Sequence, residues 1–154
     1  MTMKRHLIIG ILTAGCILSV SAGAQTTTTT KEGANGGTYQ KTKTRNEDGT
    51  VTTDKTATSP SGKTATSQRV RDTDGSDGQR GQTVTQTGPN GKSRSASQTW
   101  TNNGDGTTTR DRSATGSAGK TRSSTTNVGN GQATKTVNNR NGGTKTVTRK
   151  RRAN

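Results

Sequence analysis

The stretch Thr83-Val84-Thr85-Gln86-Thr87-Gly88-Pro89-Asn90-Gly91-Lys92-Ser93 decides the fold of this chain. It is an alternating threonine run, followed by a Gly/Pro/Asn turn and a second polar run. Thr and Val are β-branched and favour extended strands, whereas Asn-Gly supplies the positive φ angles of a tight hairpin turn. The stretch therefore predicts a β-hairpin whose threonines share one face, with Val84 and Gln86 on the other.

Turns of the same kind recur along the chain, about every 12–13 residues, and near-regular spacing of this sort indicates a repeat architecture. One set comprises residues 35–38, 61–64, 90–93, 118–121 and 141–144, and a second set comprises 47–50, 80–83, 105–107 and 130–132. We expect a mainly β fold, a repetitive antiparallel hairpin meander of about nine strands over residues 36–148. The irregular region 72–82 predicts a flexible loop, and part of the meander is expected to be disordered.

The residues after Ala24 are too polar to form a conventional hydrophobic core. Full burial of one large apolar side chain contributes about 1.5–3 kcal/mol, whereas ordering the backbone costs about 1–2 kcal/mol per residue. One expected face is rich in Thr, and the other mixes Val, Ala, Lys and Arg, so the register is weakly specified. Order is therefore expected to depend on a partner or on self-association. The larger apolar residues after Ala24 are Tyr39, Val51, Val70, Val84, Trp100, Val128, Val137 and Val147.

The N-terminus predicts an exported protein. A basic segment at 1–6 precedes a mostly apolar run at 7–20, and Ser21-Ala22-Gly23-Ala24 then places small residues where signal peptidase reads. We expect a signal peptide over residues 1–24, cleaved between Ala24 and Gln25, and a periplasmic, cell-surface or extracellular product. An alternative is lipidation of Cys16 in a lipobox-like sequence. Residues 25–35 are expected to form a disordered Thr-rich linker.

The charge of the chain is strongly positive. There are 24 Lys and Arg residues against 9 Asp and Glu residues. The basic residues are spread along the chain and peak in a basic tail at 149–154, where Arg149, Lys150, Arg151 and Arg152 are candidates for binding polyanions. Such attraction is sensitive to salt and carries no sequence information, so nucleic acid is expected only as a non-specific alternative ligand.

The residues after Ala24 lack the side chains that common catalytic sites need. They contain no His and no Cys, which removes Ser-His and Cys-His pairs and the usual zinc sites. The Gly-Lys-Ser/Thr tripeptides lack the Gly that a phosphate-binding loop needs five positions earlier, where Ala57, Gln86 and Ala114 stand. We therefore predict no catalytic, cofactor or metal site, no cofactor and no specific small-molecule substrate.

The Gly-Pro-Asn-Gly-Lys-Ser turn with its Thr-alternating flanks resembles bacterial exported Thr/Gly-rich β-hairpin repeat proteins of undefined role. That resemblance implies a cell-envelope or extracellular setting and no activity. The Thr-x-Thr triplets, such as Thr83 with Thr85, also resemble the ice-binding faces of some β-solenoid antifreeze proteins. Two hypotheses follow: a structural, adhesive or matrix protein of the envelope, or a protein that binds lipopolysaccharide, acidic polysaccharide or nucleic acid through distributed Lys and Arg.

Overall fold

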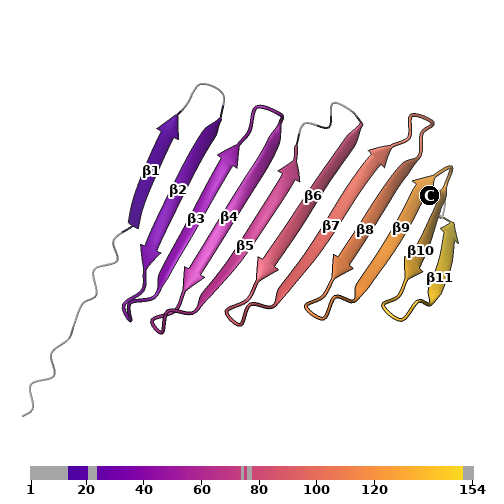
Figure 1. Cartoon of the computed structure of the whole chain (residues 1–154). Helices are drawn as coiled ribbons and strands as arrows, with labels where there is room; N and C mark the ends of the chain where they lie inside the picture. Colours follow the sequence, from indigo (N-terminus) through magenta and orange to yellow (C-terminus); the bar gives the residue numbers. More distant parts are fainter. Residues whose placement is uncertain (1–13, 21–23, 74, 76–77, 151–154) are drawn as a thin grey trace, which may run out of the picture.

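The computed structural model describes residues 14–20, 24–73, 75 and 78–150. These residues form one antiparallel sheet of eleven strands, in which each strand pairs with its neighbours in the sequence (Figure 1). The meander expected from the sequence is therefore confirmed. The strands are β1 (Ala14–Val20), β2 (Gln25–Glu32), β3 (Thr38–Arg45), β4 (Thr50–Thr58), β5 (Thr64–Asp72), β6 (Gln79–Thr87), β7 (Ser93–Asn102), β8 (Thr108–Thr115), β9 (Thr121–Gly129), β10 (Gln132–Asn138) and β11 (Thr144–Lys150).

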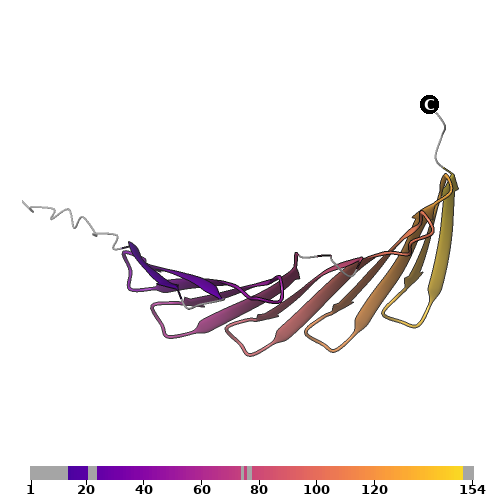
Figure 2. The same ribbon diagram turned by 90° about the horizontal axis from the view of Figure 1, so that it is seen from above.

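The sheet is a single curved layer with solvent on both sides (Figure 2). Among residues 24–73, 75 and 78–150, no side chain is buried, so these residues contain no hydrophobic core. The large apolar side chains of Trp100 and Val147 are exposed. Order in this layer rests on backbone pairing and on contacts between neighbouring strands, as in repeat proteins whose units touch only the next unit.

The turns explain why these polar strands keep their pairing. In the turn at 88–92, the Gly88 N–H donates to the Lys92 carbonyl at 2.9 Å, and the Gly91 N–H donates to the Gly88 carbonyl at 3.0 Å. Gly91 has a φ of 75°, which residues with a Cβ rarely adopt. This is the three-residue hairpin loop in which a type I turn ends on a left-handed residue. The same hydrogen bond from first to fifth residue closes the turns at 33–37, 59–63, 116–120 and 139–143, which lie along the lower end of the sheet in Figure 1.

Two expectations about irregular segments are wrong. Residues 25–32 form β2 rather than a disordered linker, because β-branched threonines pair with the threonines of β3 once that strand is beside them. The flexible loop expected at 72–82 is too long, since Asp72 ends β5 and residues 79–82 belong to β6. Gly81, expected in a turn, lies inside β6 opposite Thr99.

The expected alternation of side chains is confirmed. Thr83, Thr85 and Thr87 pair with Ser97, Ser95 and Ser93, while Val84 pairs with Ala96 on the opposite face. The expected basic tail begins inside the sheet, because β11 runs to Lys150. β1 falls within the expected signal peptide, and its backbone pairs with β2. Cleavage after Ala24 stays a prediction.

Candidate anion-binding face

The register of the sheet sorts charged residues by sign. Partners in an antiparallel pair share a face, and successive residues of a strand alternate between faces. Following the partners from β2 to β11 places every strand carboxylate, namely Glu32, Asp54, Asp72 and Asp111, on the face that carries Thr28, Thr42 and the other paired threonines. We call this the hydroxyl face.

The opposite face, which we call the basic face, holds every Lys and Arg of β2 to β11 except Lys150. The register places no Asp or Glu of these described strands on it. Its cationic residues are Lys31, Lys41, Lys43, Arg45, Lys55, Arg69, Arg71, Arg80, Arg94, Arg110, Arg112, Arg122, Lys135, Lys145 and Arg149. A carboxylate-free row of this length gives the face a positive potential along the whole sheet.

The basic face is hollowed between β3 and β6. A depression of about 660 Å³ is lined by cationic side chains of three consecutive strands, among them Lys43, Lys55 and Arg69, and by Val84 and Gln86 of β6. No Asp or Glu lines it. The hollow is therefore a place where an anionic chain would meet several cations together.

Glutamines orient the arginines of this face without neutralising them. The Arg69 guanidinium donates to Gln82 Oε1 at 2.7 Å, and Arg94 Nε donates to Gln86 Oε1 at 2.7 Å. Gln98 Oε1 accepts from Arg110 at 3.1 and 2.7 Å, and also from Arg112. The Arg110 guanidinium also lies over the Trp100 ring, 5.4 Å from its centroid. Because a guanidinium has five N–H donors, each arginine keeps donors for a ligand.

One cross-strand pair brings two like charges together. Lys41 of β3 lies directly opposite Lys55 of β4, and both line the hollow. Like charges directly opposite each other destabilise a sheet. A bound anion between the two ammonium groups would turn this repulsion into attraction, so the pair is better suited to a liganded sheet than to a free one.

Side chains of the hydroxyl face form hydrogen bonds with one another. Thr and Ser hydroxyls meet across each of the five hairpins at the lower end of the sheet, with oxygen–oxygen distances between 2.8 and 3.3 Å. These contacts join residues of the non-hydrogen-bonded pairs of the ladder. In such pairs the opposing side chains approach each other most closely. The carboxylates have neutral donors too: Gln68 donates to Asp54 at 3.0 Å, and Thr125 donates to Asp111 at 2.6 Å.

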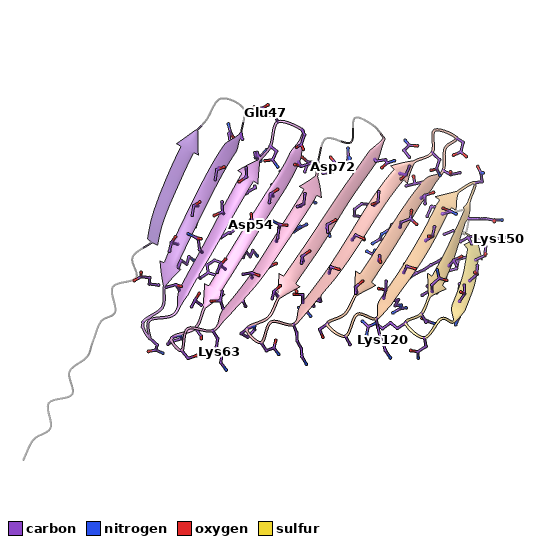
Figure 3. All side chains as sticks on the ribbon, in the orientation of Figure 1. Glu47, Asp54, Lys63, Asp72, Lys120 and Lys150 are labelled. Carbon is purple, nitrogen blue, oxygen red and sulfur yellow. The ribbon has the colours of Figure 1, made fainter. Side chains whose placement is uncertain are left out.

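The two ends of the sheet differ in charge as well. Lys63 and Lys120 lie at the lower turns, and Glu47 lies at the opposite end (Figure 3). Two upper turns share one arrangement, in which a Thr hydroxyl and its N–H donate to a turn aspartate: Thr50 to Asp48 at 2.7 and 2.9 Å, and Thr107 to Asp105 at 2.6 and 2.9 Å. These hydrogen bonds, the hydroxyl bond first, hold the pKa of each carboxyl below its ordinary value.

The candidate polyanion-binding residues of the tail do not form one cluster. Arg149 lies on the basic face, whereas Lys150 pairs with Gln132 on the hydroxyl face. Arg151 and Arg152 fall outside the described residues. Gln25, on the carboxyl side of the expected cleavage site, begins β2, and Ala24 directly precedes it. The sequence indicated distributed Lys and Arg as well as the tail residues, but not that the strand cations share one face. The alternation of Lys and Arg with Thr, as at 41–45, was the signal that could have shown it.

No protein-family model, curated protein or solved structure matches this chain. Across the described residues there is no helix with the length and hydropathy needed to span a bilayer. The described residues also contain no group of three or more His, Cys, Asp or Glu side chains placed to hold a metal ion.

Proposed function

We propose that this chain is a non-enzymatic exported protein that binds anionic polymers of the cell envelope, such as lipopolysaccharide or acidic polysaccharide, along its basic face. The observation that supports this most is the segregation of charge, with all strand carboxylates on one face and all strand cations except Lys150 on the other. Charge that served only solubility would not need to avoid carboxylates on one face.

The hollow and the Lys41–Lys55 pair make the proposal more specific. An extended polyanion lying across β3 to β6 would meet cations from successive strands, about 4.8 Å apart. The glutamine-held arginines beyond it, such as Arg94 and Arg112, would continue the contact towards β8. Binding of this type depends on charge and spacing rather than on the sequence of the polymer.

A comparison of two triple variants with the same loss of charge tests this proposal. Lys41→Gln/Lys43→Gln/Lys55→Gln removes three cations from the hollow, and Lys63→Gln/Lys120→Gln/Arg140→Gln removes three from the lower turns. Affinity for heparin, used as a defined acidic polysaccharide, is measured by calorimetry over a range of NaCl concentrations. At about 1 kcal/mol per cation near an anionic surface, we expect the hollow variant to lose on the order of a hundredfold in affinity.

The turn variant is expected to lose much less and to keep the salt dependence of the unmodified chain. Equal losses in the two variants would mean that net charge alone drives the interaction, and the proposal for the basic face would then be wrong. Duplex DNA as a second probe shows whether nucleic acid binds through the same cations.

A structural or matrix role is a second candidate, and the open edges of the sheet favour it. β11 has a partner on one side only, and an edge strand presents unpaired N–H and C=O groups that another chain can use.

A further inference from the structure

We infer that the chain left after removal of residues 1–24 assembles head to tail, with β11 of one copy pairing with β2 of the next to extend a single sheet. The inference does not depend on polyanion binding. It starts from the outer edge of β2, where β1 is seated in antiparallel register from Gln25 to Lys31. The seated strand shows that this edge can accept a partner. Cleavage after Ala24 would remove β1 and free the edge.

The direction of the strands makes β11 a suitable replacement for β1. Strands alternate in direction through the meander, so β1 and β11 run the same way (Figure 1). A neighbouring copy can therefore supply β11 where β1 lay, in the same antiparallel sense. Because β2 to β11 is an even number of strands, a second copy placed by a rotation and a shift along the curved sheet continues the alternation of strand direction without a break. Such a contact is heterologous, so repeated contacts build a multimer rather than a two-fold dimer.

The backbone groups that face outward on the two edges match. In the hairpin of β10 and β11, the Asn139 N–H donates to the Gly143 carbonyl at 2.7 Å. In an antiparallel ladder, bonded and non-bonded pairs alternate from that point. Lys145 and Val147 therefore bond to β10, while Thr144, Thr146 and Thr148 direct their N–H and C=O groups to the free edge.

The same reasoning applies to β2. The Gly33 N–H donates to the Gly37 carbonyl at 2.7 Å, so the backbone groups of Thr26, Thr28 and Thr30 point away from β3. All of these outward-directed residues lie on the hydroxyl face. Pairing the two edges thus places threonine against threonine, as the register does within the chain at Thr136 and Thr146.

Charge and threonine pairing together favour one register. With Thr146 opposite Thr28, Lys145 faces Thr29 and Arg149 faces Gln25. A slip of two residues in one direction would set Lys145 against Lys31, and like charges opposite each other are unfavourable. The geometry therefore favours the register in which the three outward threonines of β11 meet the three of β2.

Cysteine cross-linking tests the contact and its register together, because the expected exported chain contains no Cys. The full-length gene is expressed with its own leader, and N-terminal sequencing of the exported protein checks that it begins at Gln25. Within one copy Thr28 and Thr146 are separated by nine strand spacings, roughly 43 Å at about 4.8 Å each. A disulfide requires Cα atoms within about 7 Å, so the double variant Thr28→Cys/Thr146→Cys can link only between copies.

Mild oxidation of Thr28→Cys/Thr146→Cys is expected to give a ladder of linked multimers on a non-reducing gel. Thr30→Cys/Thr146→Cys represents the slipped register, and Thr28→Cys/Lys145→Cys places the thiols on opposite faces, so both should lose the ladder. Either single variant can yield at most a linked dimer. A retained leader, the absence of a ladder from Thr28→Cys/Thr146→Cys, or equal ladders in all three double variants would overturn the inference.

A second variant covers the case in which the cysteines disturb folding. Thr146→Pro removes an outward N–H that the chain itself does not use, and proline is tolerated on edge strands in that position. Light scattering should show loss of multimers to single chains, while far-ultraviolet circular dichroism keeps its β signal. Multimers that persist in Thr146→Pro would contradict pairing through β11.

Discussion

The hydroxyl face and the basic face are carried by the same strands, but their polar groups find partners in different ways. On the hydroxyl face, threonines and serines bond to each other across hairpins, and Asp54 and Asp111 accept from neutral donors. On the basic face, arginines bond to glutamines and keep spare donors, and Lys41 lies opposite Lys55. Polar groups of the hydroxyl face bond to one another, whereas the register sets no carboxylate of β2 to β11 beside the cations of the basic face.

This difference matters because the described residues have no core to hold the sheet. Hydroxyl contacts on one face can help to fix the register, which frees the other face from a structural task. The charge repulsion on the basic face opposes folding of the free chain, and a ligand that binds only the folded sheet would stabilise it by mass action. Under the proposed function, stability and anion binding are therefore coupled through the charge of the basic face.

Among the variants that separate the two faces, charge reversal on the basic face should have the largest effect, a loss of affinity for heparin. In Lys43→Glu/Arg69→Glu, two carboxylates enter the row that crosses β3, β4 and β5, where Thr53 lies between the two changed positions. The new carboxylates would pair with neighbouring cations and repel a polyanion, so we expect affinity for heparin to fall by more than about a hundredfold. Calorimetry at a constant salt concentration measures this affinity.

The control reverses the same number of charges at Lys63 and Lys120, in the lower turns. This variant has the same net charge and should lose far less affinity. A comparable loss in the control would remove the distinction between the faces.

A smaller effect is expected when a single hydroxyl is removed. Thr136 Oγ1 lies 3.1 Å from Thr146 Oγ1 on the hydroxyl face, whereas Thr126 lies on the basic face between Arg110 and Lys135. Thr136→Val keeps the β-branched shape but loses the hydrogen bond, so we expect the free energy of unfolding to fall by about 0.5–1.5 kcal/mol. Thr126→Val is the matched change on the other face, and its effect should be close to zero. Urea denaturation measures the free energy of unfolding of both variants. Equal destabilisation would show that the hydroxyl contacts do not stabilise the sheet.

The smallest expected effect is on the pH dependence of stability. It comes from the upper turns, where Asp48 and Asp105 have lowered pKa values. A carboxyl whose pKa is lower in the folded state stabilises the fold above the unfolded pKa, and this contribution is lost as pH falls through the folded pKa. Carbon-13 NMR titration of the carboxyl groups should place both below the ordinary aspartate value. In Asp48→Asn the contribution of that turn should no longer depend on pH. Titration of both carboxyls at the ordinary value would mean that the Thr50 and Thr107 bonds do not persist in solution.

Much of the fold could be predicted from local sequence. The Gly91 turn and the alternating threonines of 83–87 carry their geometry within a few residues, so the meander and its Thr-rich face followed directly. β2 could not be predicted in this way, because a run of five threonines has no alternation and becomes a strand only through its pairing with β3. The end of β5 at Asp72 and the start of β6 at Gln79 were likewise hidden by the Asp- and Gly-rich sequence around them.

The candidate site was harder to predict than the fold. The consecutive basic residues of the tail form a visible cluster in the sequence, yet the sheet separates Arg149 from Lys150. Lys43 and Arg69 are far apart in sequence and come into one row only because the register of two hairpins aligns them. A face of this kind depends on the register of every strand, and a sequence polar on both faces specifies that register weakly.

Lysine footprinting by mass spectrometry tests the central claim most directly, because one molecule carries both the test residues and the controls. The chain is acetylated with and without saturating heparin, and the extent of modification of each lysine is compared between the two samples. We predict strong protection of Lys41, Lys43 and Lys55 on the basic face and little protection of Lys63 and Lys120 at the turns. Equal protection of the two groups, or protection of the turn lysines alone, would contradict the assignment of anion binding to the basic face.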